Sequence, residues 1–420
     1  MIPGRKPWIG WGPVGKSRLL ACLALLPLRF LAAQDLIQAV GPGGAVRLFN
    51  SDSAILESTE NRKDLPCTVT PDKPLLGFDL KFHAGYEVSV PLKELAGSEN
   101  QLTMVFRVVP DGHPADPVYF SQHVSVPAID ADESGPAYLQ GYFNVGEGKY
   151  HIDWLMRDRS ERMCSFHWDA EAILPAKDKQ MGLDITASAV QPIESEPFKQ
   201  EPPVKREERD GPINIKVMMN FAPQDANSAA LQPLDINALL SILRNIAREP
   251  RIGKFSIVVY NMQEQRVFYR QDHASQIDFP ALGNAMKSLR LGTVDLKHLT
   301  QKHSDTDFLA DLVTKEFKAP NDSPDALIFA GPKVMLDDGL SPETLKQLSD
   351  VKFPVFYMNY NLNPQVNPWR DAIGSAVRFL KGIEYTISRP RDLFFAWTEI
   401  MGRIVKLKVG RSDTANVGAR

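Results

Sequence analysis

Cysteine is scarce in this 420-residue chain, which contains only Cys22, Cys67 and Cys164. No two of them form a CxxC pair, so the zinc-ribbon signature is missing. The HExxH motif of zinc proteases and the GxSxG motif of many hydrolases are also absent. These absences count against the common hydrolase and zinc-enzyme classes.

Excess charge of one sign is lacking as well. The chain has 48 Lys and Arg residues against 51 Asp and Glu residues, which leaves a net charge of -3. Without a basic excess the sequence cannot neutralise many phosphates, so we expect neither a general nucleic-acid binder nor an anionic-membrane binder. After the first 33 residues no apolar run is long enough to span a bilayer.

Residues 1–33 have the pattern of an export signal. Basic residues at 5, 6, 16 and 18 precede the apolar run 19–28, and small residues stand just before Gln34. The run is too short for a membrane anchor and is interrupted by Pro27 and Arg29. We therefore predict a cleaved signal peptide and a protein that is secreted, periplasmic or located in the cell envelope.

The same N-terminal segment contains a match to the phosphate-loop pattern GxxxxGK[ST] at residues 10–17. Phosphate binding by this loop requires a strand before it and a helix after it. No strand-like run precedes it, so we predict no nucleotide site there.

Export has a consequence for the cysteines: in an oxidising compartment Cys67 and Cys164 could form a disulfide, with two unpaired buried thiols as the alternative.

Residues 46–172 show the alternation of short strands. Apolar and polar residues alternate in 77–91, 101–109 and 118–126, and a hairpin is predicted around residues 146–148. About seven short strands with turns at this spacing predict an antiparallel, immunoglobulin-like β-sandwich. The next segment, 173–212, becomes rich in proline and in charges of both signs, which predicts a linker.

Residues 213–408 change to strands that alternate with helices. Ile213 to Phe221 is a nearly continuous apolar strand, and residues 235–248 have apolar side chains at helical spacing. This alternation continues to residue 405 and predicts a doubly wound, mostly parallel sheet with helices on both faces. Residues 409–420 are predicted to form a disordered tail.

In the order of its elements this second region resembles a von Willebrand factor A-type domain. The shared features are a first strand ending in the loop INIKVMMNFAPQ, a helix, a two-strand hairpin, a loop containing Gly292-Thr293, and a buried strand ending at Gly331. Together with the export signal and the β-rich first domain, the resemblance implies a secreted bacterial protein of this family.

The resemblance also implies positions for a metal-ion-dependent adhesion site, which the family builds from Asp-x-Ser-x-Ser, a later Thr and a later Asp. In this chain these positions are Asn220, Ala222, Gln224, Thr293 and Ala330. Only Thr293 keeps its type. Because Mg²⁺ and Ca²⁺ require charged oxygen ligands, we interpret the site as degenerate and predict no metal or other cofactor.

Two groups of histidine and acidic residues are candidate sites. His298, His303, Asp305 and Asp307 combine metal-ligand types with the spacing of a solvated connection, and we interpret them as surface polar residues. His151 and Asp153 lie on one face of a predicted strand. Acid-base chemistry there would need a third group and a cleft, so we interpret them as part of a polar outer face over a Trp-containing core.

The carboxyl edge of the parallel sheet is the best predicted interaction surface, because ligands of doubly wound folds bind at that edge. Asn220, Thr293, Tyr357 and Tyr360 should face it, and Tyr and Asn suit protein contacts. The alternative is an Asn-rich and Pro-rich loop with buried aromatic residues.

These observations predict an exported, non-enzymatic protein that binds a protein partner at this edge without a classical metal site. A first alternative is adhesion through a rearranged site for a divalent metal. A second alternative is an envelope enzyme, for which no catalytic group could be assembled from the sequence.

Overall fold

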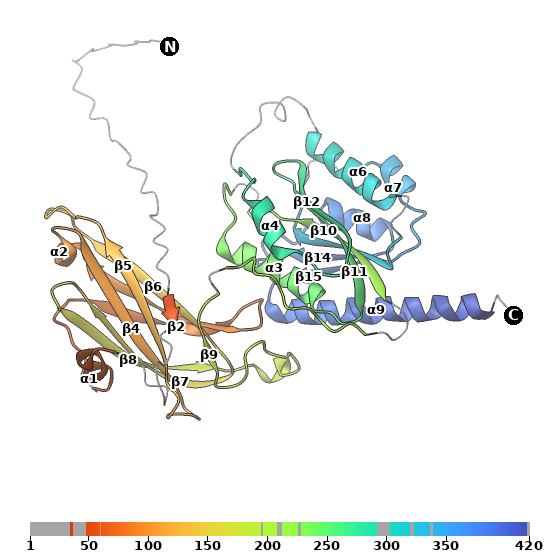
Figure 1. Cartoon of the computed structure of the whole chain (residues 1–420). Helices are drawn as coiled ribbons and strands as arrows, with labels where there is room; N and C mark the ends of the chain where they lie inside the picture. Colours follow the sequence, from red (N-terminus) through yellow and green to blue (C-terminus); the bar gives the residue numbers. More distant parts are fainter. Residues whose placement is uncertain are drawn as a thin grey trace, which may run out of the picture. The chain divides into compact units, whose positions relative to one another are not determined.

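The structure, a computed structural model, describes residues 34–36, 48–58, 60–194, 196–207, 212–225, 228–291, 303–319, 323–336 and 339–417. The predicted signal peptide, Thr293 and His298 lie outside these residues. In the described part the chain forms two antiparallel sheets followed by one mostly parallel sheet (Figure 1). No helix among the described residues is both long and apolar enough to cross a membrane.

The N-terminal part consists of a five-stranded sheet in the order β1-β5-β4-β7-β8 and a four-stranded sheet in the order β2-β3-β6-β9. All pairings in these two sheets are antiparallel. The strands are β1 (Gln34–Leu36), β2 (Thr68–Leu76), β3 (Phe82–Pro91), β4 (Asn100–Pro110), β5 (Val118–Val126), β6 (Pro136–Val145), β7 (Gly148–Arg157), β8 (Met163–Ala172) and β9 (Val190–Gln191), with short helices α1 (Asn50–Leu56), α2 (Leu92–Leu95) and a 3-10 turn (Ala176–Asp178) between them.

Aromatic side chains from both sheets form the core between them. Tyr86 of β3 contacts Phe106 of β4 and Trp154 of β7 edge-on, each at a centroid distance of 5.5 Å. Phe143 of β6 packs against Phe106 at 5.6 Å. Edge-to-face contacts of this kind suit the ring quadrupoles and add to the burial of apolar area. The alternating pattern of the sequence therefore has its expected result, two sheets with a shared apolar layer.

A disulfide and a helix complete this part. Cys67, just before β2, is bonded to Cys164 in β8, with a Cα–Cα distance of 6.3 Å. The bond therefore joins the start of β2, in the four-stranded sheet, to β8, an edge strand of the five-stranded sheet. On the outer face of the five-stranded sheet, Leu56 of α1 packs against Val105 and Leu155. Helix α1 thus covers two outward-facing apolar side chains.

The C-terminal sheet has the strand order β12-β11-β10-β13-β14-β15, in which only the pairing of β11 with β12 is antiparallel. This is the order 3-2-1-4-5-6 of doubly wound sheets. The strands are β10 (Ile213–Asn220), β11 (Ile252–Asn261), β12 (Arg266–Ala274), β13 (Ala326–Pro332), β14 (Val355–Tyr360) and β15 (Ile383–Ile387); the helices are α3 (Pro233–Ala247), α4 (Phe279–Met286), α6 (Ser304–Phe317), α7 (Pro342–Gln347), α8 (Ala372–Phe379) and α9 (Pro390–Val417).

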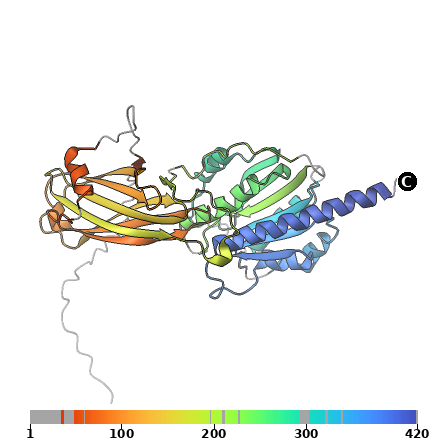
Figure 2. The same ribbon diagram turned by 90° about the horizontal axis from the view of Figure 1, so that it is seen from below.

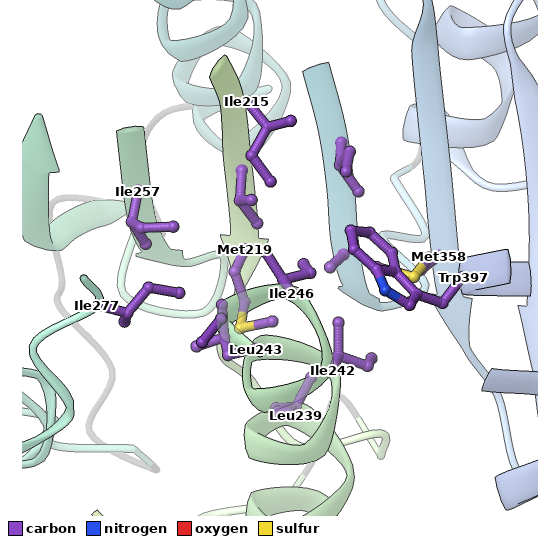
Figure 3. Packing of buried hydrophobic residues seen from close by; sticks show 14 of the residues in the cluster. Ile215, Met219, Leu239, Ile242, Leu243, Ile246, Ile257, Ile277, Met358 and Trp397 are labelled. Carbon is purple, nitrogen blue, oxygen red and sulfur yellow. The ribbon is translucent and has the colours of Figure 1, made fainter. Parts of the chain in front are cut away.

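Helices cover both faces of this sheet (Figures 1 and 2). On one face Ile215 and Met219 of β10 pack against α3 and α9, as Figure 3 shows with Leu243, Ile246 and Trp397. On the other face Met218 packs with Leu312 of α6 and Val377 of α8, among other residues. Alternate residues of β10 therefore enter two separate cores, which explains why the strand is apolar along nearly its whole length.

One charged residue interrupts the apolar strand. Lys216 of β10 faces α6, and its Nζ lies 3.0 Å from Glu316 Oε2 and donates to the Glu316 carbonyl oxygen at 3.0 Å. Both side chains are buried, at 1% and 2% exposure. Arg270 of β12 also binds the Glu316 carboxylate. A buried lysine is tolerated here because an opposite charge and further donors accompany it.

Several side chains of the segment before β10 bind the C-terminal sheet region, although most of its described residues are exposed. Glu201 pairs with Arg244 at 2.9 Å and with Arg248 at 2.7 Å, both on or just after α3. Gln200 donates to the Ile277 carbonyl at 2.8 Å, and Arg206 donates to that of Glu249 at 2.7 Å. The prolines prevent regular structure here, and the charged side chains find partners on the helices.

The end of the chain also differs from the prediction. Helix α9 continues to Val417, so residues 409–417 are helical and do not form the expected disordered tail. The first part of α9 is held by apolar contacts of Leu393, Trp397, Ile400 and Ile404 with the core. No proline and no cap-forming glycine ends the helix directly after this packed part, which explains why it continues.

Candidate functional site at the carboxyl edge of the parallel sheet

The candidate site lies where the connections of the parallel sheet diverge. From β10 the chain passes through α3 to β11, whereas from β13 it passes through α7 to β14, on the opposite side in the strand order. α3 belongs to one core, and Leu345 of α7 packs on the other. Strands β10 and β13 are neighbours, so their carboxyl ends form the switch point at which ligands bind in folds of this kind.

A groove of about 590 Å³ is present at this edge. We call it the edge groove. Three loops form it: the loop from β10 to α3, the start of the loop after β13, and the loop from β14 to α8. It is lined by Pro223, Gln224, Asp225, Ser228, Gln232, Leu234, Asp235, Lys333, Met335, Tyr360, Asn361, Leu362, Asn363, Val366 and Asn367.

The β10–α3 loop is tied to its surroundings by two side chains. Asp235, in the first turn of α3, accepts a hydrogen bond from the Gln232 backbone at 3.2 Å and completes a capping box. Gln224 Oε1 accepts from the Leu362 backbone at 3.2 Å, which joins two loops of the groove. Burial raises the pKa of Asp235, although backbone donors at Gln232 and Gln224 oppose this shift. Asp235 therefore serves to hold the loop.

The β14–α8 loop is held by Lys333, which follows β13. Lys333 Nζ donates to the Asn367 carbonyl at 2.7 Å and also to the Trp369 carbonyl. Asn361 Nδ2 donates to the same Asn367 carbonyl at 3.2 Å. With its carbonyls turned to these donors, the loop exposes the side chains of Val366 and Trp369 by 78% and 70%.

Behind the edge groove a buried polar network fixes α8. Tyr357 donates its hydroxyl proton to Asp371 Oδ2 at 2.9 Å. Asp371 caps α8 by accepting from the Gly374 backbone at 2.8 Å, and it accepts from the Val334 backbone at 2.7 Å. Burial raises the pKa of Asp371, and burial followed by the Asp371 charge raises that of Tyr357. The network connects the middle of β14, the segment just after β13 and the start of α8.

The predicted contact residues that the structure describes are buried, and Tyr360 is the one of them that lines the groove. Asn220, Tyr357 and Tyr360 are all buried, at no more than 2% exposure. Asn220 Oδ1 accepts from the Met262 backbone at 3.3 Å. Burial and the neighbouring Asp235 carboxylate raise the pKa of Tyr360. These side chains therefore support the edge, and a partner would reach other residues.

The residues that a partner can reach are apolar side chains around the groove. Leu234 and Met335 are about half exposed, at 50% and 52%, and Val366 and Trp369 are more exposed still. Sequence reasoning missed them because it searched for polar and aromatic residues at strand ends. A Val and a Trp in the polar, proline-containing run NLNPQVNPW would have been the available signal.

The adhesion-site positions implied by the resemblance lie at the same edge where they are described. Asn220 ends β10, and Ala222 lies in the loop that follows β10. Ala330 precedes Gly331 in β13. All three residues are buried. The side-chain oxygen of Gln224 is bonded to Leu362. Thr293 lies outside the described residues. At the described positions Asn220 and Ala330 stand in place of the two carboxylates of the family's site, and Ala222 and Gln224 stand in place of its two serine hydroxyls.

The predicted surface group on the second half of the chain is only partly described. His303 precedes α6 with a left-handed φ of 70°, and Asp305 and Asp307 lie in the first turn of that helix. Acidic residues suit a helix N-terminus. Among the described residues the one group of three or more His, Cys, Asp or Glu ligand atoms close enough to hold a metal is His151, Asp153 and His167, in the N-terminal part.

Gly331 is the residue at this edge that tolerates no side chain. Its φ is +130°, and a Cβ would lie 2.4 Å from the Asn220 carbonyl oxygen. We expect Gly331→Ala to lower the free energy of unfolding by about 1 to 3 kcal/mol, through backbone strain and displacement of β10. Gly402→Ala is the control, because a Cβ there meets no atom within 4 Å. Equal urea midpoints for the two variants would contradict this account.

Comparisons with known proteins leave the family open. No family model and no curated protein matches the chain. Solved structures with some similarity include a Bacteroides uniformis β-glucuronidase, at 8% identity and a TM-score of 0.19, and a Clostridium thermocellum endo-1,4-β-D-xylanase, at 10% and 0.17. The match covers 75% of this chain and 38% of the glucuronidase, and 83% of this chain and 79% of the xylanase. These TM-scores carry no argument about function.

Proposed function

We propose that the chain is an exported, non-enzymatic binding protein that holds a protein partner in the edge groove. The partner's chemistry follows from the groove: an exposed peptide segment with at least one large apolar side chain, flanked by polar groups. The observation that carries this proposal is the exposure of Leu234, Met335 and Val366 in one groove. Trp369, on the same β14–α8 loop as Val366, is also exposed and lines a second pocket that shares Lys333 with the groove. Single exposed apolar residues are common, whereas several around one groove mark an interaction site.

The support for a binding role rather than catalysis comes from the groove's ionisable groups. Asp235 is buried and its oxygens accept from the backbone of the groove's own loop. Lys333 is engaged with two carbonyls of the β14–α8 loop. Asp235 and Lys333, two of the three acidic and basic residues that line the groove, thus have structural partners, which supports binding through shape and apolar contact.

We also propose that residues 213–408 are a von Willebrand factor A-type domain with a degenerate adhesion site. Support comes from the element order: β10, α3, the β11–β12 hairpin, helices α4 and α6, β13 ending near Gly331, and two further helix-strand units. The neighbouring ends of β10 and β13, with Asn220 and Ala330, are where such a site would lie. Export through residues 1–33 remains part of the proposal and rests on the sequence alone.

A test of the groove can use peptides as probes, since the natural partner is not needed. We expect a phage-displayed peptide library panned on the full chain to yield peptides with large apolar residues. Val366→Glu should weaken their binding at least about tenfold, because a charge would be buried against an apolar side chain. Leu75→Glu is the matched control, an apolar residue of similar exposure on β2.

Two results would contradict the proposal: peptides that bind the Val366→Glu chain unchanged, or no selected peptides at all. Leu234→Ala provides a second variant in the groove that removes apolar area without adding charge. Adhesion through a rearranged metal site, with Asp225 as a substitute carboxylate, is the competing function. It requires that Mg²⁺ or Ca²⁺ raise the unfolding temperature of the wild type and that Asp225→Asn abolish the shift.

A further inference from the structure

A second site is suggested on the N-terminal part, on the outer face of the five-stranded sheet. In β7, Ile152 and Trp154 point into the core, so His151 and Asp153 point outward. In the adjacent strand β8, His167 is the register partner of Asp153, and Asp169 is that of His151. Two histidines and two carboxylates thus occupy neighbouring positions on one sheet surface.

The distances converge on one carboxylate oxygen. Asp153 Oδ1 lies 3.1 Å from His151 Nε2 and 2.9 Å from His167 Nδ1. All three atoms lie within 4.8 Å of one another. Zinc bonds of about 2.0–2.1 Å in tetrahedral geometry place ligand atoms about 3.3 Å apart. The three atoms therefore need only small shifts to become ligands of one ion.

Neighbouring charges orient two of these ligands. Asp169 Oδ1 lies 2.7 Å from His151 Nδ1. A neutral imidazole has a single N–H, so if Asp169 accepts it, Nε2 presents its lone pair toward Asp153 and His167. Arg107 of β4 binds Asp153 Oδ2 through Nε at 2.8 Å, which leaves Oδ1 directed at the histidines. His167 Nε2 has no hydrogen-bond partner among the described residues.

Burial of the cluster is graded. The Asp153 side chain is 4% exposed and that of His167 15%, whereas that of His151 is 49% exposed. An ion held here would have three protein ligands on its inner side and would face solvent on the other. Three protein ligands with one open position is the arrangement of zinc sites that bind water or a small anion.

We propose that His151, Asp153 and His167 form a site for Zn²⁺ or a similar divalent transition metal, with Asp169 and Arg107 as positioning residues. Two imidazoles and one carboxylate favour Zn²⁺ over Mg²⁺ and Ca²⁺, which prefer oxygen ligands alone. The site is independent of the edge groove and of the peptide-binding role. The open position takes water or a small anionic ligand.

Cobalt titration of the metal-free full chain tests this site, because Co²⁺ reports its coordination through visible absorption. We expect one equivalent of Co²⁺ to produce a band that Zn²⁺ removes and Mg²⁺ does not. His167→Ala should abolish the band. His151→Gln, at the most exposed ligand, is the second variant in case His167→Ala unfolds the sheet. Asp169→Asn should weaken binding about 10- to 100-fold, as removal of an outer carboxylate does.

His123→Ala is the matched control, since His123 lies on β5 of the same sheet and bonds to Thr103. Its cobalt band should equal that of the wild type. The proposal is overturned if the wild type gives no band, if folded His151→Gln binds as tightly as the wild type, or if His123→Ala also loses binding. Circular dichroism of each variant separates lost ligation from lost folding.

Discussion

Glu316→Ala is expected to lower the free energy of unfolding by about 3 to 5 kcal/mol, because it leaves the Lys216 ammonium buried without its countercharge. Lys216 is 1% exposed and lies in the central strand of the parallel sheet, so it cannot turn to solvent without displacing β10. The loss of the Glu316 carboxylate affects Arg270 less, because the Arg270 side chain is about one-third exposed and also lies near Asp272. Urea unfolding with an unchanged m value measures the effect.

Two variants make this prediction specific. The double variant Lys216→Met/Glu316→Leu replaces the pair by apolar side chains of similar volume, and it should recover most of the lost stability. Glu399→Ala removes one member of an exposed ion pair with Arg403, and it should change stability by less than about 1 kcal/mol. A loss for Glu316→Ala no larger than that for Glu399→Ala would contradict the account of the buried pair.

The same pair makes a contribution that depends on pH. Burial disfavours the Glu316 carboxylate, but hydrogen bonds from Arg270 and Lys216 outweigh it and lower the pKa of Glu316. A carboxyl group with a lowered pKa in the folded state stabilises the fold above its unfolded pKa of about 4.3. That contribution is lost as the pH falls through the folded pKa. The difference in unfolding free energy between the wild type and Glu316→Ala should therefore become smaller as the pH falls from the unfolded pKa through the folded pKa of Glu316.

Loss of the disulfide is the second large effect that we expect. Cys67 and Cys164 are separated by 97 residues, so their bond closes a long loop in the unfolded chain. Cys67→Ala/Cys164→Ala should lower the free energy of unfolding by about 3 to 5 kcal/mol, because the unfolded chain regains that conformational freedom. Far-UV circular dichroism during urea unfolding measures the change in the N-terminal transition.

Reductant supplies the control for this prediction. Dithiothreitol should destabilise the wild type by a similar amount and leave the double-alanine variant unchanged. If the wild type unfolds at the same urea concentration with and without reductant, the bond does not contribute as argued. Thiol titration of the denatured, unreduced protein should find neither Cys67 nor Cys164 reactive.

The main sheets could be predicted from local patterns of apolar and polar residues. Alternation in β3 and β7 reports which side chains face the core, and the apolar run 213–221 reports a strand buried on both faces. Such patterns are local, because one face of a strand repeats every second residue. They were sufficient to distinguish the antiparallel sheets from the mostly parallel one.

Features that depend on distant partners could not be predicted in the same way. Lys216 interrupts an apolar strand, and its partner Glu316 lies 100 residues away. The sequence places Asp153 and His151 on one polar face of a strand, and His167 joins them only through the register of β7 with β8. At the candidate edge, Tyr357 is the third of the six residues of β14 and does not lie at the carboxyl end of the strand. Its buried hydroxyl bonds to Asp371, the N-cap of α8, a partner that the sequence pattern does not reveal.

The segment before β10 has a consequence for dividing the chain into independently folding pieces. A cut at residue 212 would remove Glu201, the carboxylate that neutralises Arg244 on α3, whose side chain is only 13% exposed. It would also remove the donors that bind the carbonyls of Ile277 and Glu249. A fragment that retains residues 196–207 keeps these partners. A fragment that contains the C-terminal sheet should therefore begin within the proline-rich stretch and not at the first strand of the sheet.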